Sequence, residues 1–191
     1  MIPTTKLELS KTAIVVIDLQ EDILAAKPLF PISAQEVVTR NTALIHTFKD
    51  TDVLTVLVTV DRTTFQGLFP FPDGTMHPGE SPRSVLTIPT LGGQANVIQI
   101  TKHNPGAFFG TDLDLQLRRR GIQTIILTGV STSNGVYATA LDAYQSAYHV
   151  LIVEDACADR DLENHQFFFR KLFPRIGQVT TQKELAEMLT K

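Results

Sequence analysis

One stretch decides the fold of this chain, Thr124-Ile-Ile-Leu-Thr-Gly-Val-Ser-Thr-Ser-Asn-Gly-Val136. Its first five residues form an apolar, β-branched run that predicts a buried strand. The run breaks at Gly129 into a small polar turn, Ser131–Asn134, and a helical pattern begins directly after it. α/β enzymes place a nucleophile or an anion-binding cradle at such a strand–turn–helix junction. Here the residue at the mouth of the helix is Gly135, which has no side chain for chemistry.

The rest of the chain repeats this alternation of strand and helix. Apolar runs predict five strands and a sixth edge strand, at residues 12–17, 53–60, 96–100, 124–128, 149–153 and 178–180. Helical patterns lie between them, at residues 33–48, 112–120, 136–146, 165–172 and 183–189. Ser33 is expected to cap the first of these helices and Gly121 to end the second. The alternation predicts an α/β fold with one domain over residues 1–191. Its core is a doubly wound, Rossmann-like parallel sheet of five to six strands, with helices on both faces.

The composition limits the classes of protein that this chain can represent. With 191 residues, 43% of them hydrophobic, the chain can bury one sizeable core. A net charge of −3 and a pI near 5.9 argue against nucleic-acid and membrane-surface partners. No apolar run approaches the ~18 residues that a membrane span needs, and no signal peptide is evident. The single cysteine, Cys157, excludes an intrachain disulfide and fits a reducing compartment, so we expect a cytoplasmic protein.

Candidate functional residues are those that follow each strand, because open parallel sheets bind ligands at the carboxyl ends of their strands. Asp18 ends the first strand, where a carboxyl suits acid–base work; a helix N-cap is the alternative. Lys102 follows the third strand and can pair with Asp18, hold a substrate carboxylate, or extend to the surface. Glu154, Asp155 and Cys157 follow the fifth strand. Cys157 stands between alanines, which is more typical of a buried space-filling thiol than of a nucleophile.

Four ordered motifs span nearly the whole chain: Ala13-Ile-Val-Val-Ile-Asp-Leu-Gln20, Thr101-Lys-His-Asn-Pro-Gly-Ala-Phe-Phe-Gly-Thr-Asp-Leu113, Leu127-Thr-Gly-Val-Ser-Thr-Ser-Asn-Gly-Val136 and Val153-Glu-Asp-Ala-Cys-Ala-Asp159. Together they resemble the isochorismatase-like hydrolases, and the resemblance implies a parallel sheet with helices on both faces. The cysteine hydrolases of that family cleave small amides with an Asp–Lys–Cys triad. Asp18 and Lys102 match the first two members, and Gly135 stands in place of the cysteine.

The resemblance also implies features beyond the triad. It implies a cis peptide between Val130 and Ser131, and an oxyanion hole made by the amides of Ser131 and Gly135. It implies a homo-oligomer, a dimer or tetramer, for which the Pro- and Phe-rich segment Arg62–Thr90 is the candidate interface. The metal-dependent nicotinamidases of the family carry Asp-x-His-x-x-His after the second strand. The corresponding segment here, Asp61–Gln66, has no histidine, so neither a metal nor another cofactor is expected.

Two functions stay open because there is no thiol at position 135. True isochorismatases resemble this pattern with glycine there, and they cleave a vinyl ether. Asp18 would then be the general acid, while Lys102 would bind a substrate carboxylate and hold the water. The alternative is a protein that binds a small molecule with little or no turnover.

Several residues around these motifs are assigned to binding of the small-molecule substrate: Ser131, Thr132, Asn134, Gln20 and Phe109. An aromatic set suggests an apolar pocket wall, with core or dimer packing as the alternative: Phe65, Phe69, Phe71, Phe108 and Phe109. A substrate with two carboxylates needs a basic pocket, and the cations near the motifs are few: Lys102, Arg62 and Arg160. The sequence therefore favours a family hydrolase of unassigned substrate over a specific isochorismatase.

Overall fold

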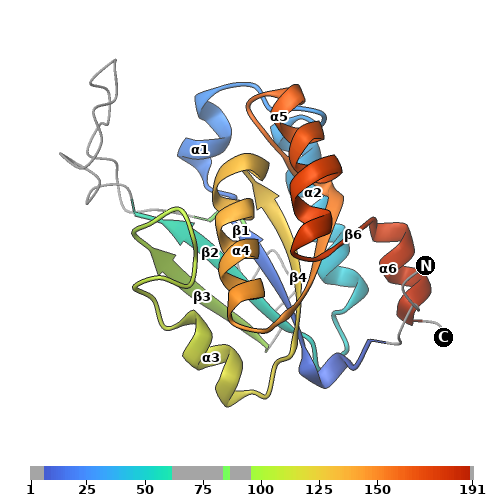
Figure 1. Ribbon diagram of the computed structural model, residues 1–191. Coiled ribbons are helices and arrows are strands. Elements are labelled where there is room, and N and C mark those ends of the chain that lie inside the picture. The colour runs from blue at the N-terminus through green and yellow to red at the C-terminus, as the bar shows by residue number, and fades with distance from the viewer. Residues whose placement is uncertain (1–6, 62–83, 87–95, 190–191) are drawn as a thin grey trace.

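The computed structural model describes residues 7–61, 84–86 and 96–189 (Figure 1). Within these residues six parallel strands form one sheet in the order β3-β2-β1-β4-β5-β6. The strands are β1 (Thr12–Ile17), β2 (Leu54–Val60), β3 (Val97–Lys102), β4 (Thr124–Val130), β5 (His149–Ala158) and β6 (Gln178–Thr180). From the central β1–β4 pair, the strand numbers rise toward both edges of the sheet. That pair is the switch point beside which doubly wound sheets bind ligands.

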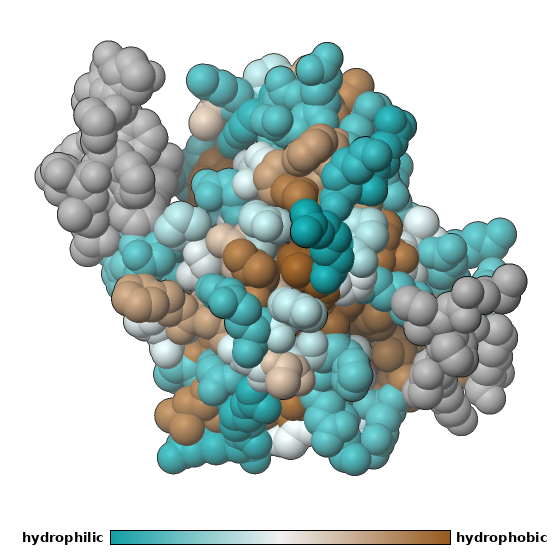
Figure 2. Space-filling model, viewed as in Figure 1, coloured by the Kyte–Doolittle hydropathy of each residue, from teal (hydrophilic) through white to brown (hydrophobic). Residues whose placement is uncertain are grey.

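Helices cover both faces of the sheet (Figure 1). They are α1 (Glu21–Ala26), α2 (Ala34–Thr47), α3 (Leu113–Arg119), α4 (Tyr137–Gln145), α5 (Leu162–Phe167) and α6 (Gln182–Leu189). Short helical turns join them: η1 (Leu9–Lys11), η3 (Thr132–Val136), η4 (Phe168–Leu172) and η5 (Phe173–Arg175). Polar side chains make up much of the face seen in Figure 2, with apolar groups interspersed among them.

The central strand shows why the sheet needs cover on both sides. All six residues of β1 are buried. Ala13, Val15 and Ile17 belong to one apolar core, together with side chains of α3 and α4. Ile14 and Val16 belong to the second core, with side chains of α2 and α6. Because successive side chains of a strand point to opposite faces, a continuous apolar run is buried only between two helical layers.

The predicted fold class is confirmed, and two of its local signals act as expected. Ser33 caps α2 in a capping box: its hydroxyl accepts from the Glu36 N–H at 3.2 Å, and the Glu36 carboxylate accepts from the Ser33 N–H at 2.9 Å. Gly121 follows α3 with a φ of +66°, the left-handed conformation that glycine adopts at little cost.

The fifth strand and the first helix differ from the prediction. β5 continues five residues past Val153, because its pairing with β4 shifts register and resumes with Cys157 opposite Gly129. Glu154 and Asp155 therefore lie within the strand instead of after it. The sequence did not predict α1, a six-residue helix with no buried residue and so no strong apolar pattern.

Other predictions fall outside the described residues. The proposed interface segment 62–90 is described only at residues 84–86, and Arg62, Phe65, Phe69 and Phe71 lie in its undescribed part. In the part of the chain that the structure describes, no helix is long and apolar enough to cross a membrane.

Candidate functional site

The chain turns sharply at Asp18, directly after β1. Asp18 has a φ of +53°, a conformation that few non-glycine residues adopt and that is often found at functional sites. Its N–H donates to the carbonyl of Val58 at 3.0 Å, and its carbonyl accepts from the N–H of Gln20 at 2.8 Å. These bonds fix the turn and hold the Asp18 carboxylate at the carboxyl end of the sheet.

Lys102 meets this carboxylate from the end of β3. Its Nζ lies 2.9 Å from Asp18 Oδ2, and it also donates to the carbonyl of Pro105 at 2.6 Å. The side chain of Lys102 is 1% exposed and that of Asp18 is 9% exposed. A buried ammonium is costly unless it is paired, and these two acceptors compensate it. Of the three positions open to Lys102 from sequence alone, the structure therefore shows the one in which it pairs with Asp18.

Gly135 lies against this ion pair. It belongs to the turn η3, which follows a cis peptide between Val130 and Ser131. A Cβ placed on Gly135 would lie 3.0 Å from both Asp18 Oδ2 and Lys102 Nζ, and 2.9 Å from Cγ2 of Ile17. Ordinary contacts of a Cβ are longer than about 3.4 Å. A side chain at position 135 would therefore point at the charged pair, and the neighbouring groups would have to shift by a few tenths of an ångström to make room for it.

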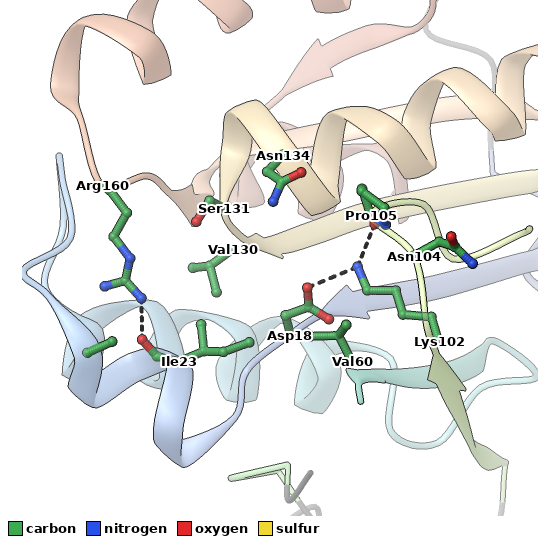
Figure 3. A pocket seen from close by; sticks show the side chains of 11 residues that line it. Asp18, Ile23, Val60, Lys102, Asn104, Pro105, Val130, Ser131, Asn134 and Arg160 are labelled. Atoms are coloured by element: carbon green, nitrogen blue, oxygen red, sulfur yellow. Dashed lines mark hydrogen bonds and ion pairs between the residues drawn. The ribbon is translucent and has the colours of Figure 1, made fainter. Parts of the chain in front are cut away.

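These residues open onto a cavity of about 190 Å³ at the carboxyl ends of the strands (Figure 3). Ser131 and Asn134 lie on the side of the turn, and Arg160 lies across the cavity from Lys102. The full lining is Asp18, Ile23, Ala26, Val60, Lys102, Asn104, Pro105, Val130, Ser131, Asn134 and Arg160. The structure thus brings together Asp18, Lys102, Ser131 and Asn134, with Gly135 next to the ion pair.

Thr132 has a different surrounding from its neighbours in the turn. It is buried, and its Oγ1 lies 2.9 Å from Nδ1 of His165 on α5. His165 is 2% exposed; burial lowers the pKa of its imidazole, although the nearby Asp159 carboxylate opposes that shift. Thr132 therefore supports the turn from behind and does not line the cavity.

Gln20 and Phe109 also lie away from the cavity lining. The Gln20 side chain is buried and bonds the end of β2: its amide donates to the Val60 carbonyl at 3.2 Å, and its oxygen accepts from the Val60 N–H at 2.6 Å. Phe109 is 72% exposed. The thiol of Cys157, a residue of β5, is fully buried in the same apolar core as Ile17, and that burial raises its pKa.

Arg160, which the sequence identified only as one of the few cations near the motifs, lines the cavity. Its guanidinium donates to the backbone carbonyls of Ile23 and Lys27, at the C-terminal end of α1 (Figure 3). No local pattern predicts these contacts, because α1 itself was not predicted. Among the described residues, no group of three His, Cys, Asp or Glu side chains is placed to hold a metal ion.

Comparison with known proteins identifies the relatives of this chain. Residues 12–184 match the isochorismatase domain. An uncharacterized isochorismatase family protein from Bacillus subtilis, YwoC, is 37% identical, and the match covers 99% of this chain and 100% of the relative. The solved structure of an isochorismatase family protein from Burkholderia thailandensis is 34% identical, has a TM-score of 0.79, and is matched over 98% of this chain and 100% of its own.

Two relatives with named reactions match over about half of the chain. Maleamate amidohydrolase from Pseudomonas putida is 30% identical over 50% of this chain and 45% of its own length. A probable isochorismatase from Pseudomonas chlororaphis is 34% identical over 45% of this chain and 42% of its own length. The first name denotes hydrolysis of an amide.

Proposed function

Because the chain belongs to the isochorismatase family, whose members are hydrolases, we propose that it hydrolyses a small carboxylate-bearing molecule by proton transfer, without a covalent enzyme intermediate. Asp18 is the general acid in this proposal, and Lys102 is its partner. The bond that suits the site best is a vinyl ether, as in isochorismatase.

One observation carries the proposal, the contact between Gly135 and the Asp18–Lys102 pair. Covalent hydrolysis of an amide needs a nucleophile beside its base. Position 135 holds none, and a Cβ there would approach both charged groups to 3.0 Å. The other thiol candidate, Cys157, is buried in the core with a raised pKa, so it is mostly protonated at neutral pH. Among the described residues, the site therefore has a proton-transfer pair and no thiol nucleophile.

A vinyl ether can be hydrolysed by such a pair. Asp18, in its acid form, donates a proton to the terminal CH₂ carbon, which becomes a methyl group. The electron pair of the ether oxygen stabilises the resulting oxocarbenium carbon. Water adds to that carbon and returns a proton to the Asp18 carboxylate, and the hemiketal then separates into an alcohol and a keto acid. A positioned acid of this kind accelerates a reaction by roughly 10²–10⁴-fold.

Cations at two sides of the cavity support a carboxylate-bearing substrate. Lys102 uses two of its three N–H donors on Asp18 and Pro105, which leaves one for a substrate. The guanidinium of Arg160 lies on the other side, bonded to the carbonyls of Ile23 and Lys27, and its charge acts on the cavity through space. In this proposal the polar groups of Ser131 and Asn134 orient the rest of the molecule.

The alternative function is that of a small-molecule-binding protein with little or no turnover. The observation that favours it is the ion pair itself. A carboxylate held 2.9 Å from a buried ammonium is stabilised in its charged form, which is the form that cannot donate a proton.

Incubation with isochorismate tests the two functions. Released pyruvate is measured with lactate dehydrogenase, and the reaction is repeated in D₂O. Proton donation to carbon places one solvent deuterium in the pyruvate methyl group. Asp18→Asn is expected to lower kcat by roughly 10²–10⁴-fold. The matched control is Asp50→Asn at an exposed turn, which should keep the wild-type rate. Undiminished turnover by Asp18→Asn would disprove the acid role; bound but unchanged isochorismate would instead support the binding function.

A further inference from the structure

The two residues that follow β5, Asp159 and Arg160, contact two different walls of the cavity. The side chain of Asp159 bonds Ser133 of the turn η3, which contains Asn134 and directly follows Ser131. The side chain of Arg160 bonds α1, which carries Ile23 on the opposite wall (Figure 3). One dipeptide thus joins both walls to the end of the same strand.

Asp159 holds the turn through a buried carboxylate. Its Oδ2 accepts from the N–H of Ser133 at 2.7 Å and from the Ser133 hydroxyl at 2.8 Å, and its Oδ1 accepts from the N–H of Asp161 at 3.2 Å. The residue is 2% exposed. Its own N–H and carbonyl pair with the carbonyl and N–H of Phe30, both at 2.8 Å. Since hydrogen bonds to a carboxylate are stronger than those between neutral groups, Asp159 fixes the turn firmly.

Arg160 holds α1 through the free carbonyls at its C-terminal end. The last carbonyls of a helix lack partners within it and favour a positive charge. The guanidinium of Arg160 supplies both a donor pair and a charge, to the carbonyls of Ile23 and Lys27. None of the six residues of α1 is fully buried, and its apolar contact with the core comes from two partly buried side chains, Ile23 and Leu24. The bonds from Arg160 restrain α1 in addition to this limited packing.

We propose that Asp159 and Arg160 are positioning residues that set the width of the cavity, and so determine which substrates reach Asp18. The proposal rests on the cavity being the substrate site of the proposed function. Arg160 controls the α1 wall, and its loss widens the cavity while leaving Asp18, Lys102 and Gly135 in place. Asp159 controls the wall of the turn, whose movement shifts Ser131 and Gly135 beside the reacting atoms.

The two residues should therefore affect different kinetic constants. Loss of the α1 wall removes binding contacts that the ground state and the transition state share, so Arg160→Ala raises KM with little change in kcat. Displacement of the turn disturbs groups next to the proton transfer, so Asp159→Asn lowers kcat. A general loss of stability would not raise KM in one variant and lower kcat in the other.

Amide hydrogen exchange of the unliganded protein tests the positioning directly. In Arg160→Ala, the Leu24 N–H, which bonds the Gln20 carbonyl within α1, should exchange about tenfold faster or more, with the turn unchanged. In Asp159→Asn, the Asn134 N–H, which bonds the Ser131 carbonyl, should exchange faster, with α1 unchanged. Arg160→Lys, which can reach only one carbonyl, should give an intermediate rate in α1.

The control and a milder variant keep this test decisive. Arg175→Ala removes an exposed arginine in η5, outside the cavity lining, and should leave exchange in both walls at the wild-type rate. If Asp159→Asn does not fold, Ser133→Ala removes one of the three bonds to the same carboxylate and should loosen only the turn.

Three outcomes would overturn the proposal. They are wild-type exchange in both variants, loosening of both walls by each variant, and a raised KM in Arg160→Ala with unchanged α1 exchange. The last would assign Arg160 to direct substrate contact. Because amide hydrogen exchange needs no substrate, the positioning roles can be tested even if the proposed reaction is wrong.

Discussion

Substitution of Gly135 by alanine is the sharpest perturbation of this site, because it adds one carbon where the charged pair lies. That Cβ would approach Asp18 Oδ2 and Lys102 Nζ to 3.0 Å and Ile17 Cγ2 to 2.9 Å. Relief of these contacts requires the neighbours to move by several tenths of an ångström. The ends of Asp18 and Lys102 can move, and their movement disturbs the proton-transfer geometry.

Two opposing contributions set the expected change in the free energy of unfolding. Overpacking by a single carbon costs about 1–3 kcal/mol, whereas alanine in place of glycine in a helical turn gains about 1 kcal/mol. The net loss of unfolding free energy is about 1 kcal/mol, which corresponds to a fall in Tm of about 2–4 °C for a chain of this size. Misplacement of catalytic groups by 1 Å can cost about 10²-fold in rate, so a shift of several tenths should lower kcat by about tenfold.

Thermal unfolding followed by circular dichroism and the pyruvate assay measure the two effects in parallel. The matched control is Gly121→Ala, because a Cβ there meets no atom within 4 Å but the φ of +66° is strained, at a cost of about 1 kcal/mol. It should lose similar stability and keep full activity. Wild-type Tm and wild-type kcat in Gly135→Ala would refute the crowding argument.

Two further predictions follow from buried titratable groups. The Cys157 thiol is buried and its pKa is raised, so Ellman's reagent should not react with the native protein and should titrate one thiol after denaturation. Iodoacetamide should likewise leave activity intact. Loss of activity on alkylation would contradict the absence of a thiol mechanism. Burial holds the pKa of His165 below the ~6.5 of an unfolded chain, so the unfolded state binds the proton more tightly than the folded state. The contribution of the neutral, buried His165 to the free energy of unfolding is therefore fully present above pH ~6.5 and declines as the pH falls below it. Urea unfolding at pH 7.5 and 5.5 should show that decline, and His165→Gln should reduce it; an equal pH dependence in the variant would assign the effect to other groups.

Local patterns in the sequence were sufficient for most of the fold. The burial of β1 on both faces is encoded in an uninterrupted apolar run, and the capping box of α2 is encoded in Ser33 and Glu36. The extension of β5 was not predictable, because charged residues stand where the register shifts and a polar interruption normally ends a strand. Helix α1 was missed because none of its residues is fully buried, and part of its restraint comes from Arg160, 133 residues or more away in the chain.

The candidate site, like the fold, was only partly predictable from the sequence. The sequence by itself determined that Asp18, Lys102 and Gly135 stand at or just after the ends of parallel strands, and parallel strands bring their carboxyl ends to one edge of a sheet. Only the tertiary structure decided how far each side chain reaches. It paired Lys102 with Asp18, turned Thr132 toward His165 and Gln20 toward Val60, and brought Arg160 to the cavity. The reason is physical: strand and helix patterns depend on neighbours within a few residues, whereas hydrogen bonds and ion pairs between distant side chains exist only once the packed sheet has brought them together.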